Sequence, residues 1–321
     1  MRSMSGSVVR TVALPLLLIP FVACANASTR PVPANVLAYD GNQVAAFSAV
    51  HAGEKASKAL IYVNTPAGTV AFDQNGNGPV EQISSGQANL AVDAQGNLYV
   101  SSRTTINVYA PGQTKPSRTI NLPDSIYTFA LDTHGNIWGG IFCANGCQQP
   151  ELFEFDNQGK LLQALSCFTV ELVDIYGLTV DAAGDAFIDG FPTSPPVAVV
   201  EFPAGSKTCR VLHTSEQGSG DLQMTEAGNL VVDDQYQNRS LTYAGPKFDK
   251  LIATTPYPNV GLGESKLRKG DHQIWVSSPA HKTVSRYPFP AGGTATVTIG
   301  PSQLPGYPAS IAVAPCAEPN C

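Results

Sequence analysis

Oxygen-bearing side chains recur at one position of a repeated pattern in this sequence of 321 residues. The set contains two carboxylates, one amide, two hydroxyls and one glycine: Asn89, Thr128, Gly177, Asp221, Glu264 and Ser310. Ca²⁺ takes six to eight oxygen ligands of these kinds. A fold that brings the six positions together would offer a calcium ion a site, and the same polar groups could instead hold water.

Motifs for other chemistry do not occur in the sequence. The five histidines fall in different segments, and neither Gly-x-Ser-x-Gly nor Gly-x-x-x-x-Gly-Lys-Ser/Thr is found. An α/β-hydrolase nucleophile and a P-loop nucleotide site therefore have no support. His281 is the one histidine that we single out, because a loop beside the candidate calcium positions would carry it. A lyase would need such a histidine together with a metal.

Repeated hairpins must position these residues. Asn89–Ser102 reads NLAVDAQGNLYVSS and Thr128–Gly140 reads TFALDTHGNIWGG, with further copies from Gly177, from Asp221 and, degraded, from Glu264. Each copy is a short alternating strand, a turn with Gly followed by Asn or Asp, and a second strand. Aspartates that open the turns should cap them by accepting backbone N–H groups: Asp93, Asp132 and Asp181.

Third and fourth strands follow each hairpin, so the unit is a sheet of four antiparallel strands. An early unit lacks its first strand, because Ile61–Ile83 aligns with Leu98–Ile120 without a gap. The missing strand occurs at the other end of the chain, in Ser310–Pro315. A ring whose first sheet is completed by the C-terminal strand explains this split, and closure removes free sheet edges.

Six second strands mark the units, with centres 37 to 49 residues apart: Tyr62, Tyr99, Trp138, Phe187, Val231 and Trp275. The sequence therefore predicts an all-β fold over residues 60–315, a six-bladed β-propeller of four-stranded blades. The first strand of each blade would line a central tunnel. The six oxygen-bearing positions would then surround one mouth of that tunnel.

The hairpins, of the form apolar-Ala-Val-Asp-x-x-Gly-Asn-Leu-Tyr-Val, resemble those of NHL-repeat and SMP-30/gluconolactonase-like propellers. The resemblance implies that Asn89, Asp221 and Glu264 hold one divalent ion, such as Ca²⁺, which polarises a lactone carbonyl. Two features depart from the lactonase pattern. Residues 265–268 read SKLR where other units read apolar-Ala-Val-Asp, and no glutamate near the start of the propeller matches the family's further ligand.

Tyrosines that precede or begin inner strands predict a binding face instead. With His281, they would lie on the loops between blades: Tyr127, Tyr176, Tyr257 and Tyr307. A tyrosine offers a stacking surface and a hydroxyl, which suits a protein, peptide or glycan ligand; rings packed between blades are the alternative. Because no catalytic set is assembled in the sequence, we expect a binding protein, with a divalent-metal lactonase-like hydrolase as the alternative function.

Residues 1–27 have the features of a signal peptide. Arg2 and Arg10 flank a polar start, residues 11–22 are apolar, and small residues follow. The apolar run is shorter than the 17 or more residues that a spanning helix needs. We therefore expect a secreted, periplasmic or cell-surface protein. Lipidation of Cys24, which would leave a lipid anchor, is the alternative processing.

Charge and composition limit the partners. The chain has 19 Lys and Arg against 25 Asp and Glu and no basic run, so we expect no nucleic-acid binding. No stretch after the signal is long and apolar enough to cross a membrane. Residues 28–59 contain an alternating segment, 36–50, that predicts an extra strand. We expect the protein to be a monomer.

Six cysteines follow the signal: Cys143, Cys147, Cys167, Cys209, Cys316 and Cys321. An even number in an exported protein predicts disulfides, although six cysteines allow fifteen connectivities. One pair flanks a tight loop at 143–147 and another would lock the tail 316–321, which leaves Cys167 to pair with Cys209. A zinc site is the alternative, but the Cys-x-x-Cys spacing typical of zinc sites does not occur.

Overall fold

A computed structural model of the chain describes residues 60–86, 88–141, 152–167, 172–192 and 198–315. The chain divides into two compact units, Met1–Asp40 and Gly41–Cys321, and the first lies wholly outside the described residues. The predicted signal peptide, the extra strand within 28–59 and the tail 316–321 lie outside them too. The described part contains no helix that is long and apolar enough to cross a membrane.

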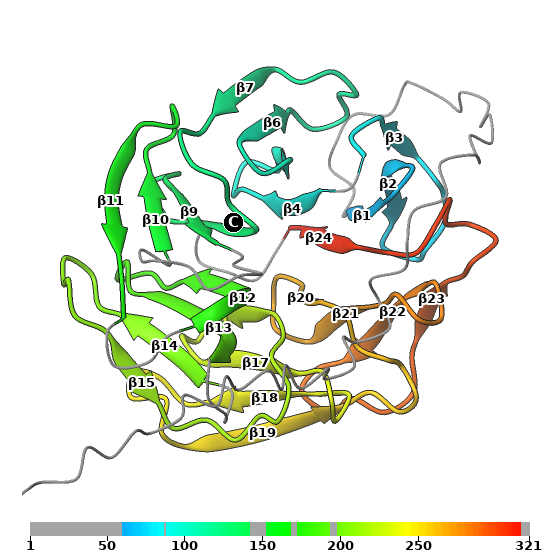
Figure 1. Cartoon of the computed structure of the whole chain (residues 1–321). Helices are drawn as coiled ribbons and strands as arrows, with labels where there is room; N and C mark the ends of the chain where they lie inside the picture. Colours follow the sequence, from blue (N-terminus) through cyan, green and yellow to red (C-terminus); the bar gives the residue numbers. More distant parts are fainter. Residues whose placement is uncertain (1–59, 87, 142–151, 168–171, 193–197, 316–321) are drawn as a thin grey trace, which may run out of the picture. The chain divides into compact units, whose positions relative to one another are not determined.

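The described strands form six four-stranded antiparallel sheets, the blades, arranged in a ring (Figure 1). From the inside outwards, blades 1 to 3 consist of β24 (Ser310–Ala314), β1 (Leu60–Thr65), β2 (Gly68–Asp73) and β3 (Glu81–Ile83); β4 (Asn89–Val92), β5 (Leu98–Ser101), β6 (Thr105–Tyr109) and β7 (Arg118–Asn121); β8 (Thr128–Leu131), β9 (Ile137–Gly140), β10 (Leu152–Phe155) and β11 (Leu161–Leu165). Blades 4 to 6 consist of β12 (Leu172–Val180), β13 (Ala186–Pro192), β14 (Ala198–Phe202) and β15 (Arg210–Leu212); β16 (Leu222–Met224), β17 (Leu230–Asp234), β18 (Arg239–Tyr243) and β19 (Leu251–Pro256); β20 (Ser265–Leu267), β21 (Gln273–Ser278), β22 (Thr283–Pro288) and β23 (Val297–Ile299).

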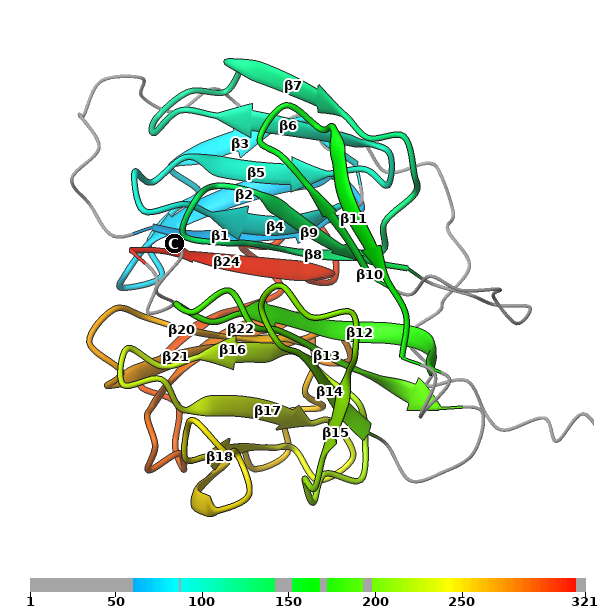
Figure 2. The same cartoon turned by 90° about the vertical axis from the view of Figure 1, so that its left-hand side faces the viewer.

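Closure of the ring follows the predicted split of the first unit. The C-terminal strand β24 pairs antiparallel with β1, with Leu60 opposite Ala314 and Asn64 opposite Ser310. Figure 2 shows β24 and β1 side by side between the strands of blade 2 and those of blade 6. The prediction of a six-bladed all-β propeller closed by its C-terminal strand is confirmed.

The hairpin turns have the capping contacts that the aspartates predict. Asp93 Oδ1 accepts from the backbone N–H groups of Gln95 and Asn97 at 3.0 and 2.8 Å. Asp132 and Asp181 accept the equivalent bonds in the next two blades. Gly96, at the tight point of the first turn, has a φ of 82°, which glycine adopts without steric cost.

Apolar side chains of neighbouring blades pack against one another and hold the ring together. Between blades 6 and 1, for example, Trp275 is fully buried in a cluster with Ile61 and Ile311. The Cys167–Cys209 disulfide, with an S–S distance of 2.04 Å, joins the end of blade 3 to the segment before β15 of blade 4. This is the predicted pair. The other predicted pairs, which involve Cys143, Cys147, Cys316 and Cys321, fall outside the described residues.

Candidate functional site at the tunnel mouth

The six repeat positions that begin with Asn89 and end with Ser310 lie at one end of the inner strands, which we call the mouth. Each stands opposite, or bonds through its backbone to, a residue of the second strand: Asn89 with Ser101, Thr128 with Gly140, Gly177 with Asp189, Asp221 with Asp233, Glu264 with Ser277 and Ser310 with Asn64. The inner strands surround the centre of the ring in Figure 1. The repeat therefore positions these residues by equivalent backbone pairing in every blade.

Polar side chains of the second strands link neighbouring blades at the mouth. In three places such a side chain accepts a hydrogen bond from the start of the next inner strand: Asn64 Oδ1 from the Ala88 N–H at 2.8 Å, Asp189 Oδ2 from the Gly220 N–H at 2.8 Å, and Asp233 Oδ1 from the Ser265 hydroxyl at 2.9 Å. Our sequence reasoning missed these residues. A polar residue directly after the apolar run of each second strand is the signal that would have found them.

One group of charged residues, which we call the axial cluster, consists of Asp221, Asp233, Glu264 and Lys266. Lys266 Nζ lies 2.6 Å from Asp221 Oδ2, and Glu264 Oε2 accepts from the Ile311 N–H at 2.9 Å. Burial, followed by the charge of Asp221, raises the pKa of Glu264 and that of Asp233 to about 7 each. Burial also raises the pKa of Asp221, while the Lys266 ammonium opposes the shift. Three carboxyl groups thus share one cation.

Two of the predicted calcium ligands, Asn89 and Asp221, have other partners in this arrangement. Asn89 directs its amide nitrogen to the Tyr127 carbonyl oxygen of the next blade. The ammonium of Lys266 stands against Asp221, where it would repel a metal cation. Within the ranges that the structure describes, no group of three or more His, Cys, Asp or Glu side chains is arranged to hold a metal ion. The site formed by Asn89, Asp221 and Glu264 therefore gains no geometrical support.

A second charged group, the loop cluster, consists of Asp189, Glu216, Asp234 and Arg239. Arg239 Nη2 lies 3.0 Å from Asp234 Oδ2, and Glu216 Oε1 accepts from the Thr214 hydroxyl at 2.7 Å. Burial, and then the charge of Glu216, raises the pKa of Asp189 well above its ordinary value. Burial likewise raises the pKa of Glu216. This cluster also holds three carboxyl groups and one cation.

The predicted binding-face residues differ in their exposure. Tyr127 is 40% exposed, and its ring meets that of Tyr176 edge to face, with centroids 6.1 Å apart. Tyr176 and Tyr307 are half-buried, and His281 is exposed. The backbone N–H of His281 donates to Ser278 Oγ at 3.4 Å. These four residues all belong to segments at the mouth end of the strands.

Tyr257 does not belong to this exposed face. Its side chain is fully buried, packs against Tyr287 with centroids 5.1 Å apart, and is 2.7 Å from the Ser240 hydroxyl oxygen. The alternative of packing between blades therefore holds for this tyrosine. In contrast, Tyr236 lies between β17 and β18 and is 59% exposed. Sequence reasoning missed Tyr236 because it follows a second strand rather than preceding an inner one.

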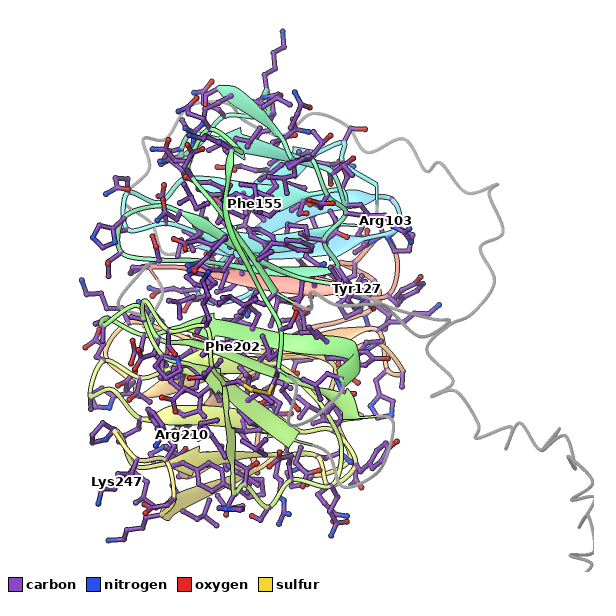
Figure 3. The ribbon with its side chains drawn as sticks, turned by 60° about the vertical axis from the view of Figure 1, so that its left-hand side comes forward. Arg103, Tyr127, Phe155, Phe202, Arg210 and Lys247 are labelled. Carbon is purple, nitrogen blue, oxygen red and sulfur yellow. A yellow bond between two sulfur atoms is a disulfide. The ribbon has the colours of Figure 1, made fainter. Side chains whose placement is uncertain are left out.

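Three basic residues and one aromatic residue show how the two faces of the ring differ. In Figure 3, Arg103 and Tyr127 lie toward one side of the molecule, whereas Arg210 and Lys247 lie toward the other. Arg103, between β5 and β6, is exposed with a φ of 64°. Its carbonyl oxygen accepts from the Ile126 N–H at 3.2 Å. The loop that presents Arg103 is thereby tied to the segment that presents Tyr127.

Comparisons with known proteins give relatives in structure and none in sequence. No protein-family model and no curated protein matches the chain. Similar solved structures include the nidogen/laminin complex, with 13% identity, a TM-score of 0.64, and coverage of 82% of this chain and 100% of that chain. A protein of unknown function from Bacteroides caccae has 11% identity, a TM-score of 0.60, and coverage of 80% and 99%. Streptogramin B lyase has 13% identity, a TM-score of 0.52, and coverage of 78% and 76%.

These likenesses, together with the strand order, define the class of the protein as a six-bladed β-propeller. Identities of 11 to 13% show the fold alone, because one fold hosts many functions. The resemblance of the hairpins to those of SMP-30-like lactonases is not confirmed by these comparisons. Function must therefore be argued from the side chains at the mouth.

Proposed function

We propose that this chain is an exported β-propeller that binds a protein partner on the face carrying the mouth loops. Export is supported by residues 1–27 and agrees with the Cys167–Cys209 disulfide, since disulfides persist mainly in oxidising compartments. A rigid ring that presents variable loops on one face is a common scaffold for recognition. A peptide or a glycan is the alternative ligand class.

The observation that carries the proposal is the exposure of aromatic side chains on loops held by the ring. Tyr127 and Tyr236 are 40% and 59% exposed, although burial of such rings is favourable. Tyrosine and arginine are enriched at the centres of protein interfaces, and the exposed Arg103 is tied to the Tyr127 segment. The loops of the mouth face thus offer stacking, hydrogen-bonding and charged groups to a partner.

A structural neighbour supports a protein as the partner. The similar chain, all of which is covered in the comparison, belongs to a nidogen/laminin complex, so a chain of this fold occurs there together with a protein partner. By contrast, the lactonase alternative has no specific observation in its favour. Lys266 pairs with Asp221, and Asn89 bonds to the Tyr127 carbonyl.

The test uses the mature, oxidised protein as an immobilised bait for the exported fraction of the source organism, with a glycan array in parallel. Tyr127→Ser and Tyr236→Ser remove the exposed rings. Leu162→Ser, on the outer strand β11 and 48% exposed, is the matched control on the rim. We expect a captured partner to bind either tyrosine variant at least tenfold more weakly and the control unchanged.

Three results would go against the proposal. A partner that is lost with Leu162→Ser but retained with both tyrosine variants would place binding on the rim. Binding on the glycan array alone, sensitive to the same tyrosines, would replace the protein by a carbohydrate. Hydrolysis of lactones by the wild type, lost in Asp221→Asn, would restore the enzymatic alternative.

A further inference from the structure

The loop cluster contains buried oxygen atoms that have no hydrogen-bond partner. Asp189 is 0% exposed and Glu216 is 6% exposed. One oxygen of each carboxyl group is held, Asp189 Oδ2 by the Gly220 N–H and Glu216 Oε1 by the Thr214 hydroxyl. The other oxygens, Asp189 Oδ1 and Glu216 Oε2, are buried without a partner among the described residues. A buried polar atom without a partner destabilises the folded protein.

A third oxygen belongs to the same place. Ser219 is 1% exposed, and its hydroxyl lies beside Asp189, whose pKa it lowers. That hydroxyl makes no well-aligned hydrogen bond within the described ranges. Glu216 and Ser219 both come from the segment that joins β15 to β16, whereas Asp189 comes from β13. The three oxygens thus connect this loop to blade 4.

Charge at this place is unbalanced. The charge of Glu216 acts on Asp189, and that of Asp234 acts on Glu216. The Arg239 guanidinium is engaged with Asp234, with Nε and Nη2 each 3.0 Å from Oδ2. Ionised, the loop cluster would carry three negative charges against one positive charge. Buried carboxylates without a counter-charge are unstable, so they take up protons or bind cations.

We propose that Asp189, Glu216 and Ser219 bind one divalent cation, Ca²⁺ or an ion of similar chemistry, between the β15–β16 loop and blade 4. The ligands are all oxygen, as Ca²⁺ prefers, and water would complete a shell of six to eight. The protein ligands are two carboxylates and one hydroxyl. They differ from the axial residues Asn89, Asp221 and Glu264. The ion balances the two excess charges and fixes the loop that begins blade 5.

The inference goes beyond the proposed function, because it concerns an ion that fixes a loop of the mouth face and not the partner that this face binds. The ion binds ionised carboxylates, so protons compete with it, and we expect the affinity for CaCl₂ to fall as the pH of the titration is lowered. An affinity that does not depend on pH would contradict binding by the two carboxyl groups.

The experiment is calorimetry of the mature, oxidised protein, stripped with EDTA and titrated with CaCl₂. We expect one ion per chain in the wild type, at least tenfold weaker binding in Glu216→Gln, and a change of less than twofold in Asp221→Asn. Ser219→Ala, which removes one neutral ligand, should weaken binding by a smaller factor. If Glu216→Gln does not fold, Ser219→Ala serves as the test variant in its place.

Thermal unfolding separates the ion site from a merely structural role. In EDTA, Glu216→Gln should unfold at a higher temperature than the wild type, because one of the facing charges is gone. In CaCl₂ the order should reverse, since only the wild type gains the ion. No heat and no shift with CaCl₂ in the wild type would overturn the proposal. Binding that is lost in Asp221→Asn but kept in Glu216→Gln would move the ion to the axis and overturn it equally.

Discussion

The two halves of the mouth have matching backbones and different charges. At the twelve paired positions of the inner and second strands, blades 1 to 3 carry amides, hydroxyls and a glycine. Blades 4 to 6 carry four carboxyl groups at the same positions: Asp189, Asp221, Asp233 and Glu264. Because the strand pairing is equivalent, the fold itself does not require the negative charge.

Asn64 and Asp189 show the difference most directly, since both accept from the backbone N–H that precedes the next inner strand. The amide of Asn64 also donates, to Gly86 O at 2.8 Å and Thr69 Oγ1 at 3.0 Å. Asp189 has no hydrogen to donate when ionised, and its Oδ1 has no partner among the described residues. An amide is therefore sufficient to join two blades, and a carboxylate adds a charge that something else must balance.

The largest expected effect comes from placing a carboxylate in the neutral half. Asn64→Asp replaces the N–H group that donates to the Gly86 carbonyl oxygen by a second acceptor, inside a fully buried site. We expect it to lower the free energy of unfolding by about 3 kcal/mol at pH 7, measured by urea denaturation. Asn121→Asp, on the exposed end of β7, is the matched control. Equal stability of the two variants would show that the buried Asn64 position tolerates a carboxylate as well as an exposed position does.

Removing the cation of the axial cluster is the next largest effect. Lys266→Gln leaves Asp221, Asp233 and Glu264 without their shared ammonium, although that side chain is 23% exposed. We expect a loss of about 2 kcal/mol at pH 7 and a smaller loss at pH 5, where Asp233 and Glu264 are protonated. The exposed Lys282→Gln serves as control. An equal loss of unfolding free energy at both pH values would argue against Lys266 balancing the charge of these carboxyl groups.

The pH dependence of stability reports on the carboxyl groups of the axial cluster. The folded-state pKa of Glu264, about 7, lies above its ordinary value of 4.5, so the folded protein holds the proton more tightly than the unfolded chain. The free energy of unfolding should therefore fall as pH rises from about 4.5 to 7, by at most about 1.4 kcal/mol per pH unit for one proton. Glu264→Gln should reduce this slope in urea denaturation series and leave the part due to Asp233, whose pKa is also about 7, and an unchanged slope would contradict the assignment.

The smallest effect is the reverse exchange in the acidic half. Asp189→Asn keeps an oxygen for the Gly220 N–H and removes one of two facing charges. In EDTA we expect the free energy of unfolding to rise by about 1 kcal/mol, with the exposed Asp249→Asn as control. A marked loss of stability in EDTA would mean that the charge of Asp189 is balanced within the chain.

The sequence predicted the features that repeat and missed those that differ between blades. The hairpin patterns and the split first unit were sufficient to predict the ring. Asp93 and its equivalents were sufficient to predict the capped turns, because backbone geometry dictates both features. The burial of Tyr257 depends on Ser240 and Tyr287 of neighbouring strands, which local patterns do not reveal. The contact of Lys266 with Asp221 likewise joins two blades, so a residue's position in its own repeat does not predict it.

Hydrogen exchange of the mature protein with its captured partner tests the account most directly, because it locates the partner without any substitution. We predict slower exchange in the loops that carry Arg103, Tyr127 and Tyr236, and unchanged exchange in the outer strands β11 and β19. Protection confined to those outer strands would contradict recognition by the mouth loops.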